Sequence, residues 1–231
     1  GQVVEDAVAG EDAVYLPDLY EAEVLVARRV LEMRDRELLP PERLNDVIGR
    51  IQRQQGIRYA PQQRQAVEAA ARQGVLILTG GPGTGKTTTV RGITALFEKM
   101  GLEILLTAPT GRAAKRMSEL TGREAQTIHR MLGMSWNPSA RAVTFSKGEK
   151  EPLEADAVIV DEMSMVDVEL FAALLRALRP GTRLIMVGDA DQLPSVGAGN
   201  VFSDLIRSGR VETVFLREVF RQAEQSAIIR N

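Results

Sequence analysis

Residues 75–87 read VLILTGGPGTGKT, and the architecture of the chain can be worked out from them. A short apolar run, residues 75–79, comes first, as is typical of a buried strand in a parallel sheet. The next residues, Gly80–Thr87, match the pattern GxxxxGK(S/T), and a helical stretch, Thr87–Lys99, follows. A strand, a glycine-rich turn and a helix in this order predict a loop that wraps around phosphate groups.

The residue types of this loop suit a nucleotide. Glycines let the backbone approach phosphate where a Cβ would collide, and the amides of the following helix point at negative charge. We expect Lys86 to reach the β- and γ-phosphates of ATP and the Thr87 hydroxyl to bind Mg²⁺. The candidate nucleotide-binding residues of the loop are Gly81, Pro82, Gly83, Thr84, Gly85, Lys86, Thr87 and Thr88. A chance glycine turn is the alternative, and the strand and helix around the loop argue against it.

Similar apolar runs recur along the chain, separated by helical stretches. The further predicted strands are 103–107, 157–160, 183–187 and 211–216. The predicted helices are 61–73, 87–99, 111–120, 166–178 and 198–208. This alternation predicts an α/β fold with a central parallel sheet that is covered on both faces.

Two regions fall outside the alternation. Residues 1–56 contain two predicted helices, 21–34 and 41–54, and we interpret them as a small helical lead-in to a domain at 57–231. Residues 133–152 interrupt the spacing of strands. In this segment Val143 and Phe145 alternate with polar residues, and Lys147-Gly148 suits a hairpin turn, so we predict a short β insert.

Composition sets broad limits on function. The chain has 231 residues, a net charge of −2 and no cysteine, so disulfides and cysteine-type zinc sites are excluded and no global basic field points to nucleic acid. The sequence lacks an apolar run of membrane length and a signal-peptide pattern, and it fits a reducing cytoplasm. Because it starts without Met and stops inside a promising segment, we expect a piece of a longer protein.

Polar residues at the ends of later strands complete a candidate catalytic set. Asp161 and Glu162 follow a buried strand, where one carboxylate would hold Mg²⁺ and the next would orient and deprotonate water. Gln192 carries an amide that can contact the γ-phosphate, and Arg221 offers a guanidinium for developing phosphoryl charge. Taken alone, Asp161 and Glu162 could equally be two surface acids after a strand.

The full set of motifs resembles superfamily 1 helicases, most closely the RecD-like branch. The stretches that carry the resemblance are Tyr59–Val67, Gly80–Thr87, Thr107–Ala114, Thr127–Leu132, Asp161–Val166, Gly188–Val196 and Val219–Gln222. The resemblance implies a RecA-like first motor domain, whose partner domain is absent, with 133–152 as its small β subdomain. It implies that Gln63 reads the adenine edge and that Arg221 acts as an arginine finger. Tyr59 departs from the family's usual Leu.

The resemblance also implies an activity, namely ATP-driven movement from 5′ to 3′ on single-stranded DNA in repair or recombination. Because ATP in this family lies between two motor domains, we expect this chain alone to bind nucleotide weakly, to hydrolyse it poorly and to unwind nothing. The alternatives are a DNA-dependent ATPase or remodeller without strand separation, a regulatory module with a decayed motor, and, least favoured, a nucleotide kinase. Protein partners in a recombination complex stay open.

Candidate DNA contacts come from three segments. The strand-to-helix junction at Pro109, Thr110, Gly111 and Arg112 is suited to a backbone phosphate, although its basic residues could also form a solvated helix face. By the resemblance, Thr127 and His129 lie near DNA, while a lone histidine is more often structural. Trp136 in the insert either stacks on bases or, with Phe145, packs the insert onto the domain.

Overall fold

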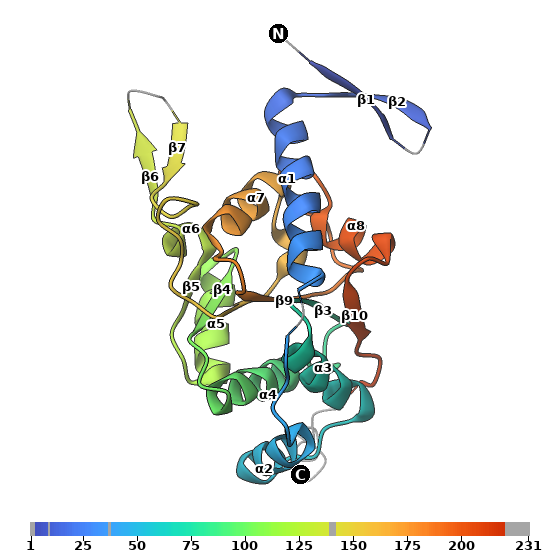
Figure 1. Ribbon diagram of the computed structural model, residues 1–231, viewed down its shortest axis with the longest axis vertical. Helices are drawn as coiled ribbons and strands as arrows, with labels where there is room; N and C mark the ends of the chain where they lie inside the picture. Colours follow the sequence, from blue (N-terminus) through green and yellow to red (C-terminus); the bar gives the residue numbers. More distant parts are fainter. Residues whose placement is uncertain (1–2, 9, 37, 139–141, 220–231) are drawn as a thin grey trace, which may run out of the picture.

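The computed structural model describes residues 3–8, 10–36, 38–138 and 142–219, and its centre is one parallel sheet (Figure 1). Six strands lie in the order β10-β3-β9-β8-β4-β5, and all neighbours are parallel. Their bounds are β3 Val75–Thr79, β4 Ile104–Ala108, β5 Ala125–Thr127, β8 Ala157–Val160, β9 Arg183–Gly188 and β10 Glu212–Phe215. The predicted α/β fold with a central parallel sheet is confirmed. The short strand β5 was not predicted.

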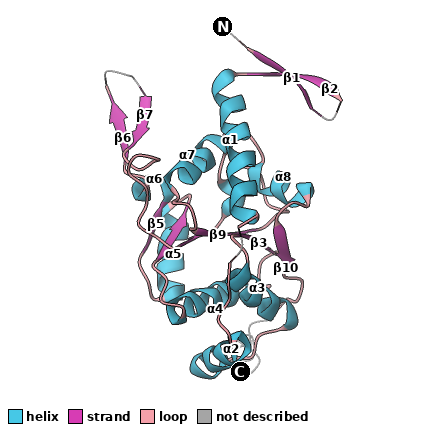
Figure 2. Cartoon of the chain, in the orientation of Figure 1, coloured by secondary structure: helices cyan, strands magenta, loops and turns pink. Residues whose placement is uncertain are grey.

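Helices cover both faces of this sheet (Figure 2). On one face lie α1 Pro17–Arg34, α6 Ile128–Met131, α7 Val168–Ala177 and α8 Val201–Ser208. On the other lie α2 Leu44–Gln55, α3 Pro61–Arg72, α4 Lys86–Lys99 and α5 Gly111–Thr121. Each face has its own apolar core, which is why the predicted helices alternate with the strands.

The central strand β3 shows why its sequence is a continuous apolar run. Val75 and Ile77 pack into the core under α1 and α7, whereas Leu76 and Leu78 pack into the core under α3 and α4. Successive side chains of a strand point to opposite faces, so a strand covered on both sides has no polar alternation. All four of these side chains are fully buried.

The N-terminal region differs in part from the predicted helical lead-in. Residues 4–8 and 11–15 form an antiparallel pair of strands, β1 Val4–Val8 and β2 Glu11–Tyr15, which the sequence did not reveal because most of their side chains are exposed. The two predicted helices are present as α1 and α2. Both contribute to the cores, through Val30 of α1 and through Ile48 of α2, for example. A domain boundary at residue 56 stays a prediction.

The predicted β insert is a hairpin of β6 Met134–Asn137 and β7 Ala142–Phe145. The prediction that Lys147-Gly148 forms its turn was wrong, because both residues follow β7 and the register pairs Asn137 with Ala142. Phe145 packs partly against the core, whereas Trp136 is 61% exposed. The packing alternative therefore holds for Phe145 alone. Among the helices of the described ranges, none combines the length and apolarity that a membrane crossing requires.

Candidate functional site

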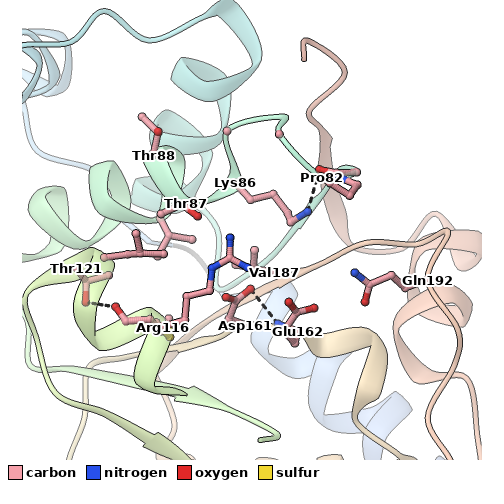
Figure 3. A pocket seen from close by; sticks show the side chains of 16 residues that line it. Pro82, Lys86, Thr87, Thr88, Arg116, Thr121, Asp161, Glu162, Val187 and Gln192 are labelled. Atoms are coloured by element: carbon pink, nitrogen blue, oxygen red, sulfur yellow. Dashed lines mark hydrogen bonds between the residues drawn. The ribbon is translucent and has the colours of Figure 1, made fainter. Parts of the chain in front are cut away.

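The carboxyl ends of β3, β8 and β9 meet at one edge of the sheet, beside a cavity of about 390 Å³ (Figure 3). The cavity brings together most of the residues that were predicted from three separate motifs. They are residues 81–83 and 85–88 of the glycine loop, together with Asp161, Glu162 and Gln192. Parallel strands order their carboxyl ends along one edge, and this arrangement places distant segments at one site.

The loop between β3 and α4 is shaped by its glycines. A Cβ on Gly80 would lie 2.7 Å from both the Leu216 carbonyl oxygen and the Thr84 hydroxyl, so only glycine fits there. Gly83 and Gly85 have φ values of +77° and +84°, in the left-handed region that favours glycine. The loop therefore holds its backbone in a tight arch at the N-terminus of α4, where amide groups attract anions.

The Lys86 ammonium bends back over this arch. It donates hydrogen bonds to the carbonyl oxygens of Gly80 and Gly81, the latter at 3.0 Å. The buried Thr84 hydroxyl also donates to the Gly81 carbonyl, at 2.8 Å, and braces the loop from outside the cavity lining. A cation held by loop carbonyls is positioned to exchange them for phosphate oxygens, which are charged and stronger acceptors.

The two adjacent acids have different surroundings. Asp161 follows β8, and its carboxylate accepts the Glu162 backbone N–H at 2.9 Å. Burial raises the pKa of Asp161, while the N–H of Glu162 and the charges of Lys86 and Arg116 oppose the rise. Burial and the neighbouring Asp161 raise the pKa of Glu162. A hydroxyl from Thr87 and a carboxylate from Asp161 are hard oxygen donors that fit Mg²⁺.

Glu162 has a backbone conformation that is costly for its residue type. Its φ is 52°, which makes it the single non-glycine residue with positive φ among the described residues. Strained backbone at a site of this kind is a sign that the direction of a side chain matters. The turn continues into a short 3₁₀ helix, Met163–Met165, whose Ser164 hydroxyl donates to the Gln192 side-chain oxygen at 3.4 Å.

Besides Thr84, two more predicted residues lie outside this cavity lining or outside the described ranges. Gln63 is buried, with its side-chain oxygen accepting the Ala60 N–H at 3.0 Å and its amide nitrogen donating to the Gly85 carbonyl at 3.4 Å. It therefore ties α3 to the glycine loop, and contact with adenine stays a prediction. Arg221 lies outside the described residues.

Sequence reasoning missed one wall of the cavity. Arg116, Met117, Leu120 and Thr121 of α5 line it, as does Val90 of α4. Arg116 lies one turn beyond the predicted DNA contact Arg112, and no motif marks it for the nucleotide. The signal that could have found this wall is helical spacing, since residues at i, i+1, i+4 and i+5 share one side of α5.

The candidate DNA residues form a second group at the same edge of the sheet. Thr110 caps α5 by accepting the Ala113 N–H, and Thr127 caps α6 by accepting the Arg130 N–H, each at 3.2 Å. Pairing of β4 with β5 sets Ala108 opposite Thr127, so the two caps follow the carboxyl ends of neighbouring strands. Pro109 is half-buried, while Gly111 and Arg112 are exposed on the first turn of α5.

The third DNA segment lies beyond α6. The half-buried His129 ring packs 6.4 Å from the Phe145 ring, between centroids, and this contact agrees with a structural role. The hairpin of β6 and β7 extends away from the sheet (Figure 1), and it carries the exposed Trp136 on β6. The three predicted segments therefore follow one another in space from β4 through β5 and α6 to the hairpin.

Comparisons with known proteins agree with this geometry. Residues 63–198 match the family described as AAA domain. The chain is 38% identical over 228 residues to the ATP-dependent RecD2 DNA helicase of Deinococcus radiodurans. This match covers 97% of this chain and 30% of that protein. It is 45% identical over 168 residues to the RecBCD enzyme subunit RecD of Mycobacterium tuberculosis, covering 63% of this chain and 28% of the subunit.

A solved structure shares the fold as well. The Pif1 helicase from Candida albicans matches with a TM-score of 0.51 and 27% identity, over 72% of this chain and 41% of that one. The chain spans less than a third of the length of the two curated relatives, at 30% and 28%. The predicted resemblance to RecD-like superfamily 1 helicases is confirmed, and the chain belongs to the AAA domain family.

Proposed function

We propose that this chain is a motor domain of an ATP-dependent DNA helicase, which binds ATP with Mg²⁺ and uses its hydrolysis to move 5′ to 3′ on single-stranded DNA. The observation that carries the proposal is one cavity lined by Lys86, Thr87, Asp161, Glu162 and Gln192. These residues come from three segments of the chain, and the chemistry that needs all of them together is cleavage of a metal-bound triphosphate.

Each of these side chains has a separate task in the proposed reaction. Lys86 leaves the loop carbonyls to neutralise the β- and γ-phosphates, and the loop amides hold the phosphate chain. Thr87 and Asp161 would hold Mg²⁺, which neutralises charge on the phosphate oxygens when it is bound. Glu162 takes a proton from the water whose oxygen attacks the γ-phosphorus. The bond to the bridging oxygen then breaks, and its electron pair stays with ADP.

Gln192 connects this chemistry to movement. It reaches the cavity from the loop after β9, whereas the acids reach it from β8, so a γ-phosphate between them would hold two segments together. Release of phosphate would let these segments separate, and a change of this kind converts hydrolysis into a conformational step. We expect a second motor domain to complete the nucleotide site, in line with the greater length of the relatives.

Single-stranded DNA is the proposed track. The caps at Thr110 and Thr127 follow the ends of neighbouring strands, and each has a hydroxyl that can donate to a backbone phosphate, while α5 adds helix-end amides. Trp136 continues this row as an exposed aromatic that can stack on a base. The row is local, so it needs no net positive charge on the chain as a whole.

The test is ATP hydrolysis by the full-length protein that carries this sequence, measured with and without single-stranded DNA. The proposal expects hydrolysis that DNA stimulates and strand separation of a duplex with a 5′ single-stranded tail. Hydrolysis that DNA leaves unchanged would sink the helicase assignment. DNA-stimulated hydrolysis without strand separation would instead favour the alternative of a translocating or remodelling ATPase.

A further inference from the structure

Arg116 is a second cation in the nucleotide cavity, and the proposed reaction gives it no task. Its side chain runs from α5 into the space between Thr87 and Asp161 (Figure 3). Its neighbour Lys115 points elsewhere, since it is 80% exposed and pairs with Glu119 at 3.9 Å. In the described part of the chain, Arg116 itself makes no ion pair with N···O of 4.0 Å or less.

The charges of the cavity are unbalanced without Arg116. Lys86 faces two carboxylates, those of Asp161 and Glu162, and two of its N–H donors are engaged by loop carbonyls. A triphosphate brings several further negative charges into the same space. The guanidinium of Arg116 lies close enough to act on both carboxylates, and it opposes the rise in their pKa.

The chemistry of arginine suits a phosphate at this position. Its planar guanidinium can form two parallel hydrogen bonds to phosphate oxygens, and it stays charged whatever its surroundings. Because Arg116 is exposed at the wall of the cavity and unpaired with any of its acids, its donors are available to a ligand without the loss of an ion pair. The guanidinium lies beside Thr87 and Asp161 (Figure 3), in the same cavity that Glu162 and Gln192 line, so a phosphate bound in this cavity would have Arg116 at its wall.

We propose that Arg116 binds the terminal phosphate of the nucleotide, as a residue that α5 contributes to the site. This inference rests on the proposed function, because it presumes that the cavity holds a triphosphate. It has one structural consequence. The helix α5 begins at Gly111 and Arg112, the predicted DNA contacts, so Arg116 would give the same rigid helix a contact with the nucleotide one turn later.

The experiment compares nucleotide affinities of the full chain carrying Arg116→Ala with those of the unaltered chain. ADP and ATPγS compete with a fluorescent ADP derivative, with Mg²⁺ and again with EDTA. An ionic hydrogen-bonded contact predicts that ATPγS binding weakens about 10- to 100-fold, while ADP binding changes little. Arg116→Lys is expected to recover part of the loss, because it restores the charge without the fork.

The controls separate this inference from the proposed function. Lys115→Ala, one residue away on α5, is expected to bind both nucleotides as the unaltered chain does, and thermal unfolding checks that all variants are folded. Three outcomes would overturn the role of Arg116 and leave the proposed function intact. Arg116→Ala could bind ATPγS as tightly as the unaltered chain does, it could lose affinity for ADP and ATPγS equally, or its loss of ATPγS affinity could vanish in EDTA. An unaltered chain that binds neither nucleotide would overturn both.

Discussion

The Ser164 hydroxyl donates a hydrogen bond to the side-chain oxygen of Gln192, with 3.4 Å between the two oxygen atoms. This contact joins the turn after β8, which carries the two acids, to the loop after β9. Ser164 is buried, whereas Gln192 is exposed at the cavity, so the hydrogen bond orients an exposed side chain from a buried one. The amide nitrogen of Gln192 faces the cavity (Figure 3).

Ser164→Ala is therefore expected to slow ATP turnover by about 2- to 10-fold, the worth of one hydrogen bond, with little change in nucleotide affinity. The affinity should hold because Lys86 and the loop supply most of the phosphate contacts. Steady-state hydrolysis and nucleotide titration by the same preparation provide the two readouts. Ser208→Ala, an exposed serine at the end of α8, is the matched control. Unchanged turnover in Ser164→Ala would remove the positioning role.

Lys86→Ala is expected to abolish ATP turnover and to weaken nucleotide binding at least about tenfold, because the ammonium is the charge that the loop presents to phosphate. The variant also loses two hydrogen bonds to the loop carbonyls, so thermal unfolding has to be measured beside binding. Lys99→Ala, at the other end of α4, keeps the same helix and the same net charge as Lys86→Ala. Normal turnover by Lys86→Ala would contradict the assignment of the cavity.

Much of the fold and most of the site could be predicted from the sequence. The strand β3 and the loop Gly80–Thr87 are predictable from the local sequence. Burial on both faces of the sheet requires a continuous apolar run, and the tight loop requires glycines. The hairpin β1–β2 and the strand β5 have no comparable sequence pattern, because their side chains are exposed or half-buried and do not need to be apolar.

The position of Arg116 was missed for a different reason. Which side of α5 faces the cavity depends on how the helix packs on β4 and β5, and this packing is a long-range property. Gln63 shows the same limit, because its hydrogen bond to Gly85 joins residues that are far apart in the sequence. Local patterns identify elements and motifs, whereas the partners of a polar side chain emerge only when the elements are packed.

Glu162→Gln is expected to keep nucleotide binding while slowing ATP cleavage by about 100-fold or more, because an amide cannot accept the proton of the attacking water. Nucleotide titration and single-turnover hydrolysis separate the two effects. Glu162→Asp is the matched comparison, since it keeps a carboxylate but shortens its reach, and an intermediate rate is expected. Rapid cleavage by Glu162→Gln would show that another group is the base.

The left-handed backbone at Glu162 makes a separate prediction about stability. Glycine normally destabilises a site relative to alanine, but here the order should reverse, because alanine keeps the strain of the φ of 52° and glycine relieves it. We expect Glu162→Gly to exceed Glu162→Ala by about 1 kcal/mol in the free energy of unfolding, measured by chemical denaturation. The usual order, with Ala above Gly, would mean that this backbone is not strained in solution.

Asp161→Asn is expected to stabilise the chain at neutral pH. Burial is the main reason that the pKa of Asp161 lies above its ordinary value, so the folded chain binds more protons than the unfolded chain between these two pKa values. The free energy of unfolding therefore falls as pH rises through this window, and the cost of the charged carboxylate is fully present above it. Asparagine carries no such cost.

The advantage of Asp161→Asn over the unaltered chain should therefore shrink as pH falls, and it should vanish below pH of about 4, the ordinary range of an aspartate. Thermal unfolding across a pH series measures this difference. Asp12→Asn, an exposed carboxylate in β2, controls for the loss of one charge. A stability difference that stays constant with pH would show that Asp161 acts through packing rather than through its charge.

The hairpin β6–β7 offers a direct test of the DNA track, because its two aromatic residues differ in exposure. Trp136 is 61% exposed, whereas Phe145 packs against the core near His129. Loss of one base-stacking contact predicts that Trp136→Ala weakens single-strand binding by about 5- to 100-fold at fixed salt, with an unchanged melting temperature. Phe145→Ala should instead lower the melting temperature, because it removes partly buried apolar surface.

Fluorescence anisotropy with a labelled oligonucleotide and thermal unfolding of the full-length protein measure the two quantities side by side. Val143→Ala, an exposed apolar residue opposite Trp136 in the hairpin register, is the matched control for a small surface change. If Trp136→Ala lowers the melting temperature and leaves DNA affinity as it was, the indole packs in solution and the track must run elsewhere. A loss of affinity alone would place DNA on the hairpin, because it would show that the indole contributes to binding without contributing to stability.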